Sequence, residues 1–104
     1  MMNIQVQIGK NHGDGTVVRL PRAFNFNVYD EFRKACEGLP ATSHMIFDMR
    51  EVENMDSSAL GMLLWARDYF GGDTDRLKIT NCQPRVQSIL SVAHFDRFFR
   101  VLEK

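Results

Sequence analysis

The sequence has few of the features that would indicate a secreted, redox-active or nucleic-acid-binding protein. Only two cysteines occur among 104 residues, Cys36 and Cys82, and no Cys-x-x-Cys motif is present. Their separation favours two buried free thiols over a zinc site, a redox pair or a disulfide framework. Lys+Arg and Asp+Glu both number 13, so the formal net charge is zero. Nothing therefore draws the chain to DNA, RNA or an anionic membrane, and we expect no nucleic acid as a partner.

Long apolar runs are also missing. No stretch approaches the roughly 20 apolar residues that a membrane-spanning helix needs, and residues 1–10 do not form the apolar region of a signal peptide. These absences predict a cytoplasmic protein without direct membrane insertion. Hydrophobic residues make up 44% and charged residues 25%, as in an ordinary globular protein. The length predicts a single domain over residues 1–104.

Patterns that would indicate catalysis or metal binding are sparse. The three histidines fall in a predicted turn (His12), before a predicted strand (His44) and at the end of a predicted helix (His94). No Gly-x-Ser-x-Gly motif accompanies a serine, and no His, Cys and Asp residues share metal-ligand spacing on one element. We therefore expect no enzymatic activity, no metal and no cofactor.

Hydrophobic periodicity in the first half of the chain predicts two strands and a helix. Residues 3–8 alternate between apolar and polar, which is typical of a half-buried strand. The turn residues at 11–15 lead into a second apolar stretch at 16–20, so a hairpin is predicted. Helical spacing then begins near Asn27, a plausible N-cap, and Gly38 predicts the helix end.

The second half of the chain continues this alternation. Residues 45–49 are mostly apolar, which favours a central strand buried on both faces. Four further elements are predicted: a largely buried helix from Asp56-Ser57-Ser58 to Phe70, a short strand at 77–79, a helix starting at Pro84 and an edge strand at 98–102. The order ββαβαβα(β) predicts the α/β class, with a mixed β-sheet of four to five strands covered by helices.

The segment that follows the predicted central strand is the most informative. Residues 56–63 read Asp-Ser-Ser-Ala-Leu-Gly-Met-Leu. They resemble the signature of the STAS family, the domain of bacterial anti-sigma-factor antagonists, in which the pattern D-S-[ST]-G-L-G-x-L leads into a helix. The order of elements is similar along almost the whole chain, as is the turn at 81–86. Two positions differ: Ala59 replaces a glycine, and the segment 21–26 lacks the acidic residue of a Gly-x-[LI]-D motif.

The resemblance implies a partner-switching protein and not a catalyst. Ser57 would be phosphorylated by a serine kinase/anti-sigma factor of the histidine-kinase-like ATPase fold and freed by a PP2C-type phosphatase. Ser58 is the minor alternative as phosphoacceptor. Only the unphosphorylated form would then capture the kinase or a related regulator. The implied partner-binding surface consists of the residues around the phosphoacceptor: Asp56, Ser57, Ser58, Ala59, Leu60 and Met62.

The residues alone give this segment a physical rationale. A serine at the start of a helix lies near free N–H groups and the positive end of the helix dipole, which both favour an anion. Phosphorylation adds about −1.5 to −2 charge at pH 7. A simple N-cap is the alternative interpretation of these residues. The combination of a carboxylate, two hydroxyls, Ala59, Leu60 and Gly61 directly after a predicted central strand favours a regulated phosphoacceptor. The large apolar side chains of this helix are mostly predicted to be core, with Trp65 as the first candidate for an exposed partner anchor.

Two further hypotheses compete with the switch. Similar lone STAS domains bind the ATPase of a lipid-transport complex at the inner face of a membrane, where the serine contributes contact and phosphorylation is not needed. Alternatively, the domain is a silent interaction module in which Ser57 only caps a helix. The acidic residue missing near Phe24 slightly favours these two hypotheses, but the intact Asp56-Ser57-Ser58 favours the switch more strongly.

Overall fold

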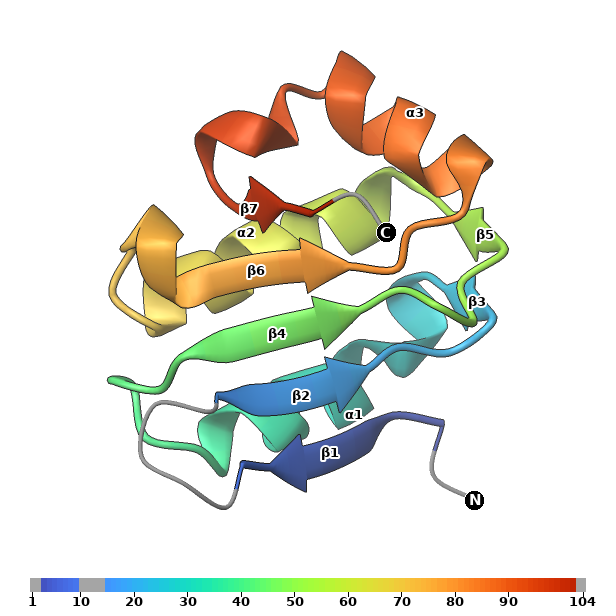
Figure 1. Ribbon diagram of the computed structural model, residues 1–104. Coiled ribbons are helices and arrows are strands. Elements are labelled where there is room, and N and C mark those ends of the chain that lie inside the picture. The colour runs from blue at the N-terminus through green and yellow to red at the C-terminus, as the bar shows by residue number, and fades with distance from the viewer. Residues whose placement is uncertain (1–2, 10–14, 103–104) are drawn as a thin grey trace.

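The computed structural model describes residues 3–9 and 15–102 and contains a five-stranded sheet with helices behind it (Figure 1). The predicted turn at 11–15, with His12, lies outside the described residues except for Gly15. The sheet order is β1-β2-β4-β6-β7. Its strands are β1 (Gln5–Ile8), β2 (Thr16–Arg19), β4 (Met45–Asp48), β6 (Leu77–Thr80) and β7 (Arg100–Val101). A second, two-stranded sheet pairs β3 (Ala23–Phe24) with β5 (Asn54–Met55).

Helices connect the parallel strands. The α-helices are α1 (Tyr29–Glu37), α2 (Ser57–Tyr69) and α3 (Pro84–Val92), and the 3₁₀ helices are η1 (Phe26–Val28), η2 (Thr74–Arg76) and η3 (Phe95–Arg97). β1 and β2 are antiparallel, whereas β2, β4, β6 and β7 run parallel. The parallel strands β2, β4, β6 and β7 follow one another across the sheet in the same order as in the chain. When all crossover connections have the same hand and move across the sheet in the same direction, their helices lie on the same face of the sheet.

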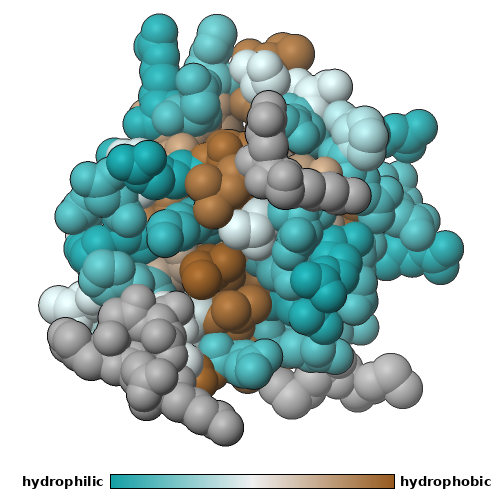
Figure 2. Space-filling model, in the orientation of Figure 1, coloured by the Kyte–Doolittle hydropathy of each residue, from teal (hydrophilic) through white to brown (hydrophobic). Residues whose placement is uncertain are grey.

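The core lies between the sheet and these helices. Alternate residues of the inner strands point into it and are buried, among them Val18, Phe47 and Ile79. The intervening residues, including Val17 and Ile46, lie on the opposite face, where they are only half-buried. Figure 2 views this open face and shows apolar atoms in a narrow band between hydrophilic flanks. The sheet is thus covered by helices on one side only.

Most of the predicted elements are confirmed. The domain is α/β with a mixed sheet of five strands, and 45–48 is its central strand. The helix start at Pro84 is also confirmed. The helix predicted to run to Phe70 has that residue as its C-cap, and the two glycines that follow, Gly71 and Gly72, have positive φ. The N-cap prediction for Asn27 is wrong. Asn25 caps the preceding η1 by accepting a hydrogen bond from the Asn27 N–H, and α1 begins two residues later without a side-chain cap.

The strand predicted at 3–8 is shorter and more exposed than its alternation indicates. Ile4 is 2% exposed, but Val6 is 42% and Ile8 67% exposed, and every residue of β1 is classed as exposed. The reason is tertiary: β1 is an edge strand with a neighbouring strand on one side only, and Glu31 of α1 bonds to it at Ile4. The strand predicted at 98–102 is likewise reduced to the two residues of β7. The N–H groups of Phe98 and Phe99 donate to the carbonyl of Phe95 in η3, so these two residues belong to a turn and not to the strand.

Both cysteines are free and buried, as predicted. Burial is the main cause that raises the pKa of the Cys36 thiol to about 12 and that of Cys82 to about 11. Thiols that stay protonated at neutral pH are poor nucleophiles and poor metal ligands. Cys36 and Cys82 therefore act as small core residues.

Candidate functional site

The N-terminus of α2 is built around the side chain of Asp56. The residue is extended (φ −113°, ψ −175°), and its Oδ1 accepts hydrogen bonds from the Ala59 N–H at 3.1 Å and from the Ser58 hydroxyl at 2.6 Å. The hydrogen bond from Ser58 is the largest cause that lowers the pKa of the Asp56 carboxyl, followed by that from Ala59. Asp56 is therefore ionised at neutral pH and fixes the start of the helix.

The two serines at this helix start are not equivalent. Ser58 is half-buried and donates its hydroxyl to Asp56. Ser57 is exposed at the first helical position, and among residues 3–9 and 15–102 its hydroxyl has no hydrogen-bond partner. A hydroxyl that is exposed and free is the more accessible of the two to another protein.

The exposed face of α2 continues from Ser57 along the helix. Gly61 and Leu64 follow at i+4 and i+7, so they share this face. Gly61 is exposed, and a Cβ atom there would meet nothing within 4 Å. Leu64 is 39% exposed, and Leu60 is half-buried. The helix thus presents a small, partly apolar surface beside Ser57.

Two residues that were predicted to bind a partner, Ala59 and Met62, lie beneath the surface. Ala59 is completely buried, and Met62 is only 3% exposed. Both side chains belong to the hydrophobic core with Leu63 and Ala66. The structure therefore brings Asp56, Ser57, Ser58 and Leu60 to or near the surface and leaves Ala59 and Met62 beneath it.

Trp65 is half-buried and is not the most exposed large apolar side chain of this helix. Its ring stacks on Tyr69, with 5.6 Å between centroids, and meets Phe32 edge-on at 6.4 Å. The Arg33 guanidinium lies 5.9 Å from its centroid. Trp65 therefore packs between α2 and α1, and Leu64 takes the exposed position. The hydrophobic pattern of the helix does not single out Leu64; only its position seven residues after Ser57, once that serine is taken as exposed, could have identified it.

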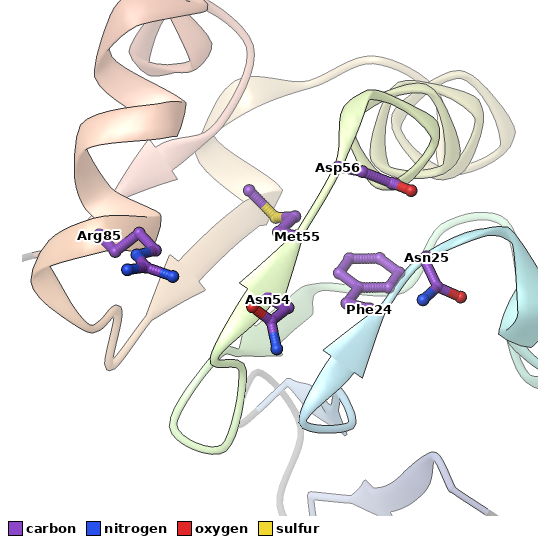
Figure 3. Close-up of a pocket in the computed structure, with 6 residues that line it drawn as sticks. All are labelled: Phe24, Asn25, Asn54, Met55, Asp56 and Arg85. Atoms are coloured by element: carbon purple, nitrogen blue, oxygen red, sulfur yellow. The ribbon is translucent and has the colours of Figure 1, made fainter.

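A shallow pocket of about 220 Å³ opens next to Asp56 (Figure 3). It is lined by Phe24, Asn25, Asn54, Met55, Asp56 and Arg85. The parallel pairing of β3 with β5 brings the first five together, and Arg85 comes from the first turn of α3. In Figure 3, β5 lies between Arg85 and Asn25. The pocket thus has one cationic side chain, one anionic side chain and two amides.

Phe26 is the most exposed aromatic side chain among the described residues. It is 65% exposed and stacks flat on Tyr29, with 5.2 Å between centroids and 9° between planes. It follows Asn25, which lines the pocket beside Asp56. The sequence analysis did not identify Phe26 as a surface residue. Phe24 and Phe26 are separated by one residue, and the structure buries Phe24 and exposes Phe26.

A polar cluster around Asp48 joins the loops that follow β4 and β6. Asp48 is 3% exposed. Its Oδ1 accepts hydrogen bonds from the Arg50 N–H at 2.9 Å and the Asn81 Nδ2 at 3.1 Å, while its Oδ2 lies 3.3 Å from Arg19 Nε. Burial raises the pKa of Asp48, but these hydrogen bonds and the charge of Arg50 outweigh it, so the pKa is lowered overall. The ionised carboxylate thereby holds the loop that leads to β5 and α2.

No group of three or more His, Cys, Asp or Glu residues is arranged to hold a metal ion within residues 3–9 and 15–102. In the same ranges, no helix combines the length and the apolarity that crossing a membrane requires.

Comparison with known proteins gives one consistent answer. The family model described as the STAS domain matches residues 3–104. A STAS-domain containing protein of Pseudomonas aeruginosa is 34% identical over 90 residues, which cover 86% of this chain and 89% of that protein.

Solved structures share the fold. An anti-sigma-factor antagonist (STAS) domain protein from Planctomyces limnophilus superposes with a TM-score of 0.76 at 19% identity, covering 97% of this chain and 89% of that one. The anti-sigma factor antagonist SpoIIAA in its unphosphorylated form gives a TM-score of 0.69 at 14% identity, covering 97% and 87%. SpoIIAA of Bacillus in its phosphorylated form gives 0.61 at 14% identity, covering 97% and 90%.

Proposed function

Because the chain belongs to the STAS domain family, we propose that it is a partner-switching protein of the anti-sigma-factor antagonist type, controlled by phosphorylation of Ser57. In the unphosphorylated form it binds a serine kinase/anti-sigma factor of the histidine-kinase-like ATPase fold or a related regulator. A PP2C-type phosphatase returns the phosphorylated protein to that form. Its role is binding and not catalysis.

The observation that carries this proposal is the difference between the two serines. The Ser58 hydroxyl is engaged by Asp56 at 2.6 Å, whereas Ser57 is exposed at the first position of α2. A kinase can reach Ser57 without breaking the cap of the helix. The structural neighbour SpoIIAA exists in unphosphorylated and phosphorylated forms, which supports the same mode of control for this fold.

The physics of the site favours a local switch. A phosphate at the helix start is stabilised by the free N–H groups and the helix dipole, so the fold persists after phosphorylation. The same phosphate places about −1.5 to −2 charge next to ionised Asp56 on the contact surface. A partner must then desolvate a strongly hydrated anion to bind. Phosphorylation therefore weakens binding without unfolding the domain.

The proposed contact surface extends the predicted one. It retains Asp56, Ser57, Ser58 and Leu60 and adds two exposed apolar side chains, Leu64 and Phe26. Exposed apolar groups beside a polar centre are the usual anchors of a protein interface. Ala59 and Met62 contribute only by supporting this surface from the core.

Gly61 provides a test of this surface. We expect Gly61→Ala to raise the free energy of unfolding by about 0.5–1 kcal/mol, because alanine is the better helix former and its methyl group meets no atom of the domain. We expect the same variant to bind the kinase partner more weakly, because the methyl group enters the contact beside Ser57. Urea unfolding and isothermal titration calorimetry measure the two effects. Stabilisation with unchanged affinity would remove Gly61 from the contact surface.

Mass spectrometry of the protein purified from its native host tests the switch directly. Under several growth conditions, the peptide that carries residues 56–65 should gain one phosphate on Ser57 in some conditions and lose it in others. A partner that co-purifies while Ser57 is never phosphorylated would contradict the switch. That result would favour a constitutive accessory subunit, for example one that binds the ATPase of a lipid-transport complex.

A further inference from the structure

β1 forms an open edge of the five-stranded sheet (Figure 1). The Gly9 N–H donates to the Gly15 carbonyl at 3.0 Å. In an antiparallel pair, every second residue of a strand directs its backbone N–H and C=O toward the neighbouring strand, so those of Gln7 and Gln5 also face β2. Those of Ile4, Val6 and Ile8 therefore point out of the sheet. The Ile4 N–H is occupied by Glu31 Oε2 at 2.6 Å. Val6 and Ile8 thus present backbone donors and acceptors along the edge.

The side chains along this edge are apolar and accessible. Val6 and Ile8 are two of the large exposed hydrophobic residues of the domain. A groove beside them is lined by Ile4, Gln5, Val6, Glu31, Lys34 and Ala35. Natural proteins normally protect a sheet edge with proline, charged residues or a very short strand.

The two edges of the sheet differ in this respect. The opposite edge strand, β7, has two residues, and its Arg100 pairs with Asp75 at 2.9 Å. β1 has four residues, Gln5–Ile8, without a proline or a charge. The β1 edge is therefore the one that is suited to pairing with another strand.

We propose that two copies of this protein associate through β1, antiparallel and around a two-fold axis at Gln7. Val6 of each copy then lies opposite Ile8 of the other, and each such pair exchanges both backbone hydrogen bonds. The two five-stranded sheets become one continuous sheet. The exposed apolar side chains of both copies are covered in the same step.

The residue on the axis argues for a second copy over an unrelated strand. In a two-fold interface, the residue that lies on the axis faces the same residue of the second copy. A charged residue at that position would therefore face a like charge and be repelled. Gln7 is uncharged, and its amide carries both a donor and an acceptor, so it pairs with itself. Gln7 also lies in a non-hydrogen-bonded position of the new strand pair, where facing side chains are closest.

A single cysteine at the axis tests this geometry even if the dimer is weak. Facing Cα atoms in a non-hydrogen-bonded pair are about 4.5 Å apart, within the range that a disulfide spans. Gln7→Cys should therefore form a disulfide-linked dimer on mild oxidation. Gln5→Cys is the matched control, since it lies on the same face of the same strand but opposite Gly9 of the second copy. The native thiols are buried and stay protonated.

Sedimentation analysis provides a second measurement with the protein as it is. The average mass should rise from monomer toward dimer with concentration. Gln7→Lys, which places two like charges at the axis, should remain monomeric, whereas Gln5→Lys should behave as the unmodified protein. Equal cross-linking of Gln7→Cys and Gln5→Cys, or a monomeric mass with no selective cross-link at Gln7, would overturn the proposal. Neither readout depends on Ser57 or on the kinase partner.

Discussion

Replacing Ser57 by aspartate should abolish capture of the kinase partner, whereas Ser57→Ala should retain it. A fixed negative charge at the first position of α2 reproduces the desolvation cost and the repulsion expected of a phosphate, while alanine keeps the surface neutral. A loss of about 3 kcal/mol, the upper end of typical coupling energies, weakens the affinity roughly 100-fold. Isothermal titration calorimetry with the partner isolated from the host measures both variants.

The fold should tolerate both substitutions at Ser57. The side chain is exposed and its hydroxyl is not part of the Asp56 cap. An acidic residue in the first turn is also favourable to the helix dipole. Ser88→Asp makes the same change at an exposed serine of α3 and serves as the control, with unchanged affinity expected. If Ser57→Asp binds as tightly as Ser57→Ala, the switch does not reside at this serine.

The second large effect is expected at Asp48, away from the contact surface. Asp48→Ala should lower the free energy of unfolding by about 2–3 kcal/mol, because the Arg50 N–H, Asn81 and Arg19 lose a buried acceptor together. Asp75→Ala is the control: its carboxylate pairs with Arg100 at 2.9 Å but is 75% exposed. We expect that control to cost less than about 1 kcal/mol. Urea unfolding compares the two, and equal costs would show that the Asp48 cluster contributes no more than a surface pair.

The pH dependence of stability gives an independent measure of Asp48. Its pKa in the folded protein is lowered from the usual value of about 3.9 that an unfolded chain shows. The unfolded state therefore binds the proton more readily, and the contribution of Asp48 is fully present above the unfolded pKa. It is lost as the pH falls through the folded pKa. The difference in unfolding free energy between the unmodified protein and Asp48→Asn should shrink in that acidic window, and a difference that stays constant would exclude the linkage.

Local signals in the sequence determined the order of the elements and the start of the candidate site. Alternation, helical spacing and the residues Gly71-Gly72 and Pro84 mark most of the boundaries that the structure contains. Asp56 was predicted as a cap and is one. Such features depend on neighbours within one turn or one strand, so they can be predicted from the chain alone. The family signature likewise lies in one continuous segment.

Only the tertiary structure decided which side chains of α2 are available. This helix is apolar on nearly all sides, so periodicity could not orient it. Packing against the sheet and α1 buries Met62, covers Trp65 in part and leaves Leu64 exposed. The neighbouring elements therefore determine which face of α2 is exposed, and the hydrophobic pattern of the helix does not.

The contacts between segments that are distant in the sequence could not be predicted from the sequence either. β3 and β5 have two residues each, too few to show a period, yet their pairing places Asn25 beside Asp56. Asp48 meets Asn81 because β4 and β6 are adjacent parallel strands whose ends share one edge of the sheet. Val6 and Ile8 alternate as a half-buried strand would, but the edge position of β1 leaves them exposed. Burial depends on what the rest of the chain places nearby, and no local pattern contains that information.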